Sequence, residues 1–187
     1  MGKLLTGLSA IVLFAYPFAI YFGLDRFGLN AIGGMLIVAL LLRLFSAHKT
    51  PLKEFKFLAF TTGIIGIILV TLGIVFKQYG WLKFYPVAVN LCMLGIFSLS
   101  LKQPQTIIER LARLQEPELP QSGVDYTRKV TLLWCAFFII NGSIALYTCF
   151  QPVKTWTLYN GFISYLVAGG LFAGEWIVRQ WVRKRHK

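Results

Sequence analysis

Six long apolar stretches dominate this sequence and leave few folds open to it. Each contains 18 to 23 residues, and a helix needs about 20 apolar residues to cross a bilayer core about 30 Å thick. Hydrocarbon offers no hydrogen-bond partner to the backbone, so such stretches must be helical. We therefore predict an all-α, polytopic membrane protein with six transmembrane helices in one integral membrane domain, residues 1–187. The predicted spans are 4–24, 28–47, 55–76, 84–101, 130–150 and 156–178.

The composition agrees with this prediction and excludes an ordinary soluble domain. Hydrophobic residues make up 57% of the chain and charged residues only 14%, which is far from the average of soluble proteins. The first apolar run continues to Leu24 without a small-residue cleavage site, so we expect it to be a retained helix rather than a signal peptide. The three cysteines show no CxxC spacing and are expected to be packing residues.

The basic residues are distributed unevenly between the two ends of the predicted helices. With six spans, 15 of the 19 Lys and Arg residues fall on the side that holds both termini, and the other four are Arg26, Lys77, Lys83 and Lys154. Cytoplasmic loops are enriched in Lys and Arg, so we predict a bacterial inner-membrane protein with cytoplasmic N- and C-termini. The net charge of +12 then reflects attraction to anionic lipid headgroups rather than a nucleic-acid partner.

The only long connection, 102–129, has the pattern of a short cytoplasmic amphipathic helix at about 106–115. Thr106 and Glu109 form a capping-box pattern. Apolar residues then recur at helical spacing, with charged residues expected on the other face and a favourable four-residue spacing from Glu109 to Arg113. Pro117 and Pro120 end the pattern. We expect this helix to lie on the membrane surface.

Candidate site residues fall into two groups. Asn90, Asn141 and Asn160 lie within predicted spans, where an unpaired amide costs several kcal/mol. Two interpretations remain open for these amides, namely hydrogen bonds between helices and the lining of a polar cavity. The second group is a candidate lipid-headgroup site near the cytoplasmic side. It comprises Arg110, Arg113, Arg128, Lys129, Glu175 and Arg179.

Both groups also have structural explanations. Arginine suits bidentate phosphate binding, but the positive-inside bias explains the same basic residues without any site. Glu175 and Arg179 are four residues apart and are expected to pair at the end of the last span. Trp134, Phe137 and Phe138 share a helical face with Asn141, which we interpret as a packing stripe. We predict no catalytic residues, no metal site and no cofactor.

Several segments resemble a family of uncharacterised bacterial inner-membrane proteins whose members are often encoded beside aryl-polyene or fatty-acid-synthase-like genes. The segments that carry this resemblance are 85–90, 108–113, 116–120, 126–131, Trp134, Phe137, Phe138, Asn141, 159–161 and 174–176. More distantly, the order of spans, Lys102–Pro104 and Trp134–Phe138 are similar to the intracellular septation protein A family. That family is implicated in envelope integrity and septum formation, and this chain differs from it in a longer first span and a longer basic tail.

The resemblance implies a non-enzymatic accessory or scaffold protein of cell-envelope or envelope-lipid biogenesis. Its expected partners are membrane lipids and proteins of envelope biogenesis or lipid synthesis. A carrier or flippase for a lipid-linked intermediate is the first alternative, and it requires Asn90 and Asn141 to border a continuous polar cavity. A membrane-embedded transferase is the second alternative, and it requires Glu109, Glu175 and His48 to face one cleft.

Overall fold

The computed structural model describes residues 2–47 and 53–185, with the side chains of 16–24, 26–45 and 53–180. Every element in this part of the chain is helical, and it contains no β-strand. The elements are α1 (Gly2–Ala47), α2 (Lys53–Val75), η1 (Tyr79–Phe84), α3 (Tyr85–Ser100), α4 (Ile107–Arg113), α5 (Gln121–Cys149), α6 (Val153–Leu158), η2 (Tyr159–Ile163) and α7 (Ser164–Arg185).

Five helical segments are long and apolar enough to cross a membrane, and each overlaps one of the predicted spans. They are Arg26–Phe45, Lys53–Val75, Tyr79–Ser100, Gln121–Cys149 and Val153–Gln180. The all-helical class is therefore confirmed, and the five segments fit a multi-pass membrane protein. The remaining predicted span, 4–24, is helical as the first part of α1. Most of its side chains lie outside the described residues, so the sixth crossing stays a prediction.

The first two predicted spans are joined by a bend within α1. At Gly28 the backbone has φ 75° and ψ 167°, outside the helical region. This conformation is essentially restricted to glycine, because a Cβ atom would clash with the backbone. The predicted spans 4–24 and 28–47 thus meet at a bend whose backbone geometry Gly28 provides, while residues 25–27 are helical.

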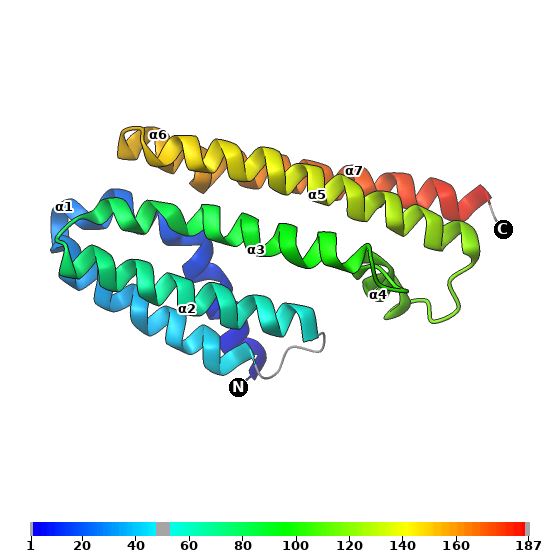
Figure 1. The fold of residues 1–187 in the computed structure, drawn as a ribbon, viewed down its shortest axis with the longest axis horizontal. Helices are drawn as coiled ribbons and strands as arrows, with labels where there is room; N and C mark the ends of the chain where they lie inside the picture. The colour runs from blue at the N-terminus through cyan, green and yellow to red at the C-terminus, as the bar shows by residue number, and fades with distance from the viewer. Residues whose placement is uncertain (1, 48–52, 186–187) are drawn as a thin grey trace.

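The long helices run roughly side by side (Figure 1), with α1 packed along α2 and α3 along α5. One end of the bundle carries the start of α2, the whole of α4, the start of α5 and the end of α7 (Figure 1). We call it the basic end, because these segments carry Lys53 and Lys56 on α2, Arg110 and Arg113 on α4, Arg128 and Lys129 on α5 and Arg179 on α7. The opposite end carries η1 and α6.

Apolar side chains cover much of the outside of the bundle. Only 6% to 33% of the residues in each candidate span are buried, whereas soluble proteins seldom leave large continuous apolar patches in water. Hydrocarbon is the solvent that such a surface fits. Exposed examples from three helices are Ile64, Ile68, Leu132, Ile139, Phe172 and Ile177.

A buried cluster near the end opposite the basic end fixes the helices to one another. Trp156 is fully buried, and its indole Nε1 donates to the carbonyl oxygen of Lys83 at 3.0 Å. The Lys83 amine donates in turn to the carbonyl oxygen of Gln151 at 2.6 Å. Tyr16 from α1 donates to the carbonyl oxygen of Leu82 at 2.5 Å. These bonds connect α1, η1 and the α5–α6 turn.

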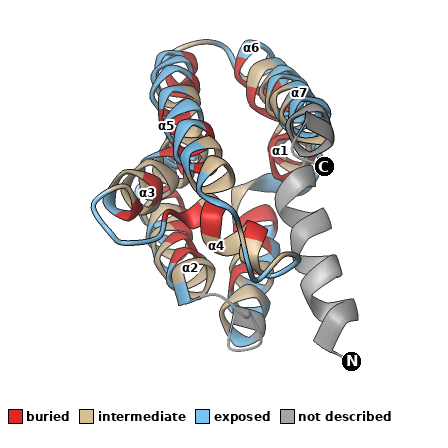
Figure 2. Cartoon of the chain, turned by 90° about the vertical axis from the view of Figure 1, so that its right-hand side faces the viewer, coloured by how far each residue is buried: buried red, intermediate tan, exposed pale blue. Residues whose placement is uncertain are grey.

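The helix predicted at 106–115 is present as α4, and its predicted cap is confirmed: Thr106 Oγ1 accepts from the amide of Glu109 at 3.3 Å. Its two faces differ from the prediction. Glu109, expected on the charged outer face, is only 3% exposed, whereas Leu114 is 62% exposed. The reason is that α4 packs between the ends of neighbouring helices (Figure 2), in contact with α3 and α5.

Candidate functional site

Two arginines of the predicted headgroup site, both on α4, are engaged in ion pairs. The guanidinium of Arg110 binds the carboxylate of Glu54 at the start of α2 and also the side-chain oxygen of Gln103. Arg113 pairs with Glu109 at 2.8 Å, as the four-residue spacing predicts, and donates to the Pro117 carbonyl oxygen at 2.9 Å. Arg110 therefore links α4 to the start of α2, whereas the contacts of Arg113 stay within α4 and the segment that follows it. Both guanidinium groups have a carboxylate partner.

Arg128 and Lys129 are exposed on the first part of α5, away from the ion pairs of α4. Arg128 lies two residues before Val130, which is a rotation of about 200° around the helix. Val130 faces the interior and lines the cavity described below. The structure therefore does not gather these four of the five predicted cations into one site. Two are paired on α4, and two are exposed on α5.

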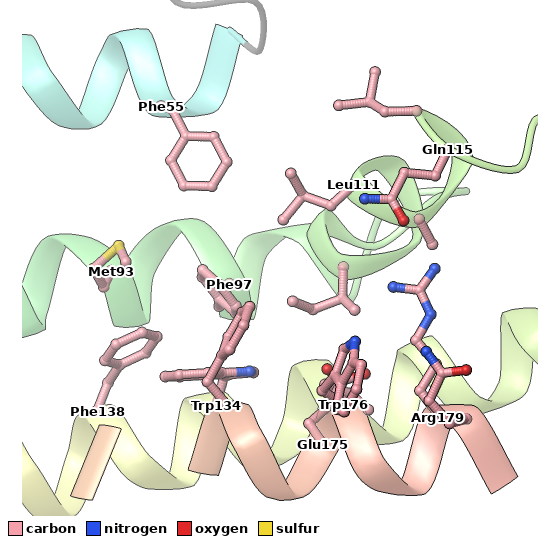
Figure 3. Close-up of a pocket in the computed structure, with 16 residues that line it drawn as sticks. Phe55, Met93, Phe97, Leu111, Gln115, Trp134, Phe138, Glu175, Trp176 and Arg179 are labelled. Carbon is pink, nitrogen blue, oxygen red and sulfur yellow. The ribbon is translucent and has the colours of Figure 1, made fainter. Parts of the chain in front are cut away.

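A large cavity opens at the basic end, between α4 and the neighbouring long helices (Figure 3). Its volume is about 550 Å³, within the range of roughly 300–1,000 Å³ that holds small-molecule ligands. Most of its wall is apolar, with aromatic side chains from α2, α3, α5 and α7. The lining residues are Phe55, Met93, Phe97, Ile108, Leu111, Ala112, Leu114, Gln115, Val130, Trp134, Phe138, Phe172, Glu175, Trp176, Arg179 and Gln180.

The charged groups of this cavity, Glu175 and Arg179, both come from α7. They do not form the predicted ion pair, since no carboxylate among the described side chains lies within ion-pairing distance of Arg179. The Tyr126 hydroxyl from α5 instead donates to Glu175, with the carbonyl oxygen at 3.1 Å and Oε1 at 3.4 Å. The cavity thus combines an apolar interior with a guanidinium that has no carboxylate partner within the described part of the chain.

The asparagines of the spans form hydrogen bonds between helices. Asn141 on α5 donates to Oδ1 of Asn90 on α3 at 3.0 Å, and its own Oδ1 accepts from the Tyr159 hydroxyl at 2.9 Å. Asn90 also donates to the carbonyl oxygen of Pro86 at 2.8 Å. Asn160 donates to Thr148 Oγ1 at 3.0 Å and to the backbone of its own helix. These contacts favour the interhelical interpretation of the amides.

A smaller cavity of about 190 Å³ lies beside the three asparagines, deeper between the helices. Asn90, Asn141 and Asn160 line part of it, together with aromatic and aliphatic residues. Met93 and Phe138 belong to the walls of both cavities. These two side chains therefore mark the inner limit of the large cavity, and none of the arginines discussed above lines the small one.

Sequence reasoning found part of this site and missed the rest. Periodicity identified the face with Trp134 and Phe138 as a packing stripe, and these rings do pack with Phe97. The sequence did not show that they also line the large cavity (Figure 3). Other lining residues, such as Phe55, Leu111 and Trp176, could not be identified because they come from separate helices. His48, named for the transferase alternative, lies outside the described residues.

Comparison of the chain with known family models, with curated proteins and with solved structures found no match. The proposed function therefore rests on the fold and on the cavity.

Proposed function

We propose that this chain is a six-span inner-membrane protein with cytoplasmic termini that acts as a non-enzymatic accessory protein of envelope-lipid biogenesis. In this proposal it holds a lipid-like molecule at the cytoplasmic interface of the membrane. The observation that carries the proposal is the cavity of about 550 Å³ at the basic end. An apolar cavity with a few polar groups at one side matches the general form of sites for amphiphilic ligands.

The position of the cavity supports a lipid rather than a water-soluble ligand. Its walls are built by candidate membrane spans, and α4 contributes Ile108, Leu111 and Ala112 from the connecting segment. The positive-inside bias assigns this end to the cytoplasmic leaflet. A ligand seated here would have its apolar part among the spans and its polar part near the headgroups.

The contacts of the nearby carboxylates support a role without catalysis. An acid/base mechanism requires titratable groups within reach of one reacting centre. Glu109 is buried against Arg113, and Glu175 accepts hydrogen bonds from Tyr126. Each carboxylate thus has a structural partner that accounts for its position.

The test is a gene deletion with quantitative analysis of envelope lipids, complemented by wild-type protein or by Leu111→Trp, which places a larger side chain in the cavity. We expect the deletion to alter the envelope lipids, the wild type to restore them and Leu111→Trp to fail at equal membrane abundance. The matched control is Leu132→Trp, at an exposed position on the outside of α5, which should complement. Unchanged lipids in the deletion strain, or full complementation by Leu111→Trp, would contradict the proposal.

Reporter fusions test the topology separately. We expect a fusion after Lys187 and a fusion within the 102–129 connection to report a cytoplasmic location, and a fusion at Lys154 to report the opposite side. A fusion after Lys187 that reports the outer side would refute the six-span arrangement.

A further inference from the structure

We infer that the ligand of the large cavity is an amphiphile with one acyl chain and an anionic head, a carboxylate or a phosphate, that binds Arg179. This inference rests on the proposed function and identifies the class of molecule that the accessory protein holds. It combines two observations at one place, an apolar cavity and a guanidinium at its wall.

Its lack of a carboxylate partner within the described part of the chain distinguishes Arg179 from Arg110 and Arg113. Its place in the cavity wall distinguishes it from the exposed Arg128. Arg110 and Arg113 each have a carboxylate partner, whereas Arg179 has none among the described side chains. Arg179 is half-buried, and in Figure 3 its guanidinium extends from α7 toward α4, on the side of the cavity where Gln115 lies. A guanidinium presents paired donors that match the two oxygens of a carboxylate or phosphate. An anionic head would supply the ion-pair partner that the described side chains do not.

Glu175 is the one acidic side chain in the cavity wall, so its charge must be considered. An anion near Arg179 would be repelled by the Glu175 carboxylate. The hydrogen bond from Tyr126 draws this carboxylate toward α5 and satisfies one of its oxygens. The two α7 charges therefore act on a bound anion in opposite directions, and neutralising them separately should change affinity in opposite directions.

The shape of the apolar part indicates one acyl chain. Trp134, Phe97 and Phe138 form a continuous aromatic wall, with ring centroids of the Phe97–Phe138 pair 5.2 Å apart at an interplanar angle of 74°. Met93 and Phe138 close the inner end, and the space beyond them is only about 190 Å³. A chain entering beside Arg179 would run along the aromatic wall and end at these two side chains.

The experiment uses the full chain in nanodiscs of phosphatidylcholine and a stearic acid that carries a photoreactive diazirine near the chain end. After irradiation, peptide mass spectrometry locates the labelled residues. We expect labels near Met93, Phe97 and Phe138. Unlabelled single-chain lipids then compete with this probe, and their relative strength defines the preferred head. Stearate tests the carboxylate and stearoyl lysophosphatidate tests the phosphate. Stearoyl lysophosphatidylcholine and stearyl alcohol serve as the zwitterionic and neutral controls.

Three variants test the assignment of the charges. Arg179→Met should weaken competition by the anionic lipids by about tenfold, the size expected for one charge-assisted hydrogen bond at a partly exposed site. Glu175→Gln should strengthen it, and Arg128→Met, which removes an exposed cation on the other face of α5, should leave it unchanged. Far-UV circular dichroism of each variant verifies that it is folded.

Each outcome decides a different claim. Anion-selective competition with opposite effects of Arg179→Met and Glu175→Gln supports the inference. Labels in the cavity that all four competitors remove equally would overturn the anionic head and leave the proposed function standing. Labels spread over the outer faces of the spans, with none in the cavity, would overturn both.

Discussion

The hydrogen bonds of Asn141 allow a quantitative prediction of how much this side chain contributes to the free energy of unfolding. This amide is 6% exposed and connects three elements, because it donates to Asn90 on α3 and accepts from Tyr159 on η2. If its function is to hold the helices together, Asn141→Ala must lower the free energy of unfolding. If it lined a transport path instead, the same change would have little effect on stability.

The expected size follows from the bonds that are lost. Hydrogen bonds between membrane helices contribute about 0.6 kcal/mol on average and at most about 1.7 kcal/mol. Asn141→Ala removes two of them and leaves the Asn90 oxygen without its partner, which adds a cost of about 1–3 kcal/mol where no water reaches it. We therefore expect a loss of roughly 2–4 kcal/mol. In a double-mutant cycle with Tyr159→Phe, the coupling energy should be about 0.6 kcal/mol.

The assay is reversible unfolding in mixed micelles with increasing dodecyl sulfate, followed by circular dichroism. Ser143→Ala is the matched control, because Ser143 is an exposed polar residue two positions further along α5 and bonds only to its own helix, at the Ile139 carbonyl oxygen. The control should change stability by no more than about 0.5 kcal/mol. An Asn141→Ala variant as stable as Ser143→Ala, or a zero coupling energy with Tyr159→Phe, would refute the reasoning.

Three further predictions concern backbone contacts and the position of α4, and all three are read in the same unfolding assay unless stated otherwise. Gly66→Ala would bring a Cβ to within 2.8 Å of a leucine side chain on α1 and should cost about 1–3 kcal/mol, whereas Gly95→Ala, which meets open space, should not destabilise the protein. Gly28→Ala should cost about 1–3 kcal/mol because of the backbone conformation at that residue; a variant as stable as wild type would contradict the bend. Glu54→Gln removes the carboxylate that binds Arg110, so hydrogen exchange of the α4 amides should become faster, while the stability of the bundle changes by no more than about 1 kcal/mol; unchanged exchange would show that α4 does not depend on this ion pair.

The parts of the fold that sequence predicts well are those set by local composition. A helix that crosses hydrocarbon needs a continuous apolar run, so five spans could be located from their residues alone. Because the prediction follows apolar composition, it also missed the start of α5. The apolar run begins at Val130, but the helix begins at Gln121, because backbone hydrogen bonding continues where apolar composition stops. The π-helical turn η2 was also missed. Its Gly161 lies so close to α1 that an added Cβ would be 3.1 Å from the Phe18 ring, a constraint that depends on a distant segment.

The sequence predicts which types of residue belong to the candidate site, but it does not predict which carboxylate pairs with each arginine. Arg110, Arg113 and Arg179 are equivalent in a count of basic residues near the cytoplasmic side. The fold separates them, because Glu54 and Glu109 form ion pairs with the first two, and no described carboxylate lies within ion-pairing distance of the third. Side chains brought together from different helices decide which charge is available to a ligand, and sequence spacing carries that information only for pairs within one helix.

The large cavity depends on α4, and α4 cannot be stable by itself. A helix of seven residues is too short to persist in isolation. Its position is set at one side by the ion pair to α2 and at its start by Ser100, whose hydroxyl oxygen accepts from the Ile107 amide at 3.1 Å. Its other side supplies Ile108, Leu111 and Ala112 to the cavity wall. The same contacts that hold α4 therefore also form the cavity, so the paired charges on α2 and α4 would act on the proposed ligand only indirectly. They place the apolar wall that the proposed acyl chain would contact, whereas Arg179, on a separate helix, is the residue that we propose binds the anionic head.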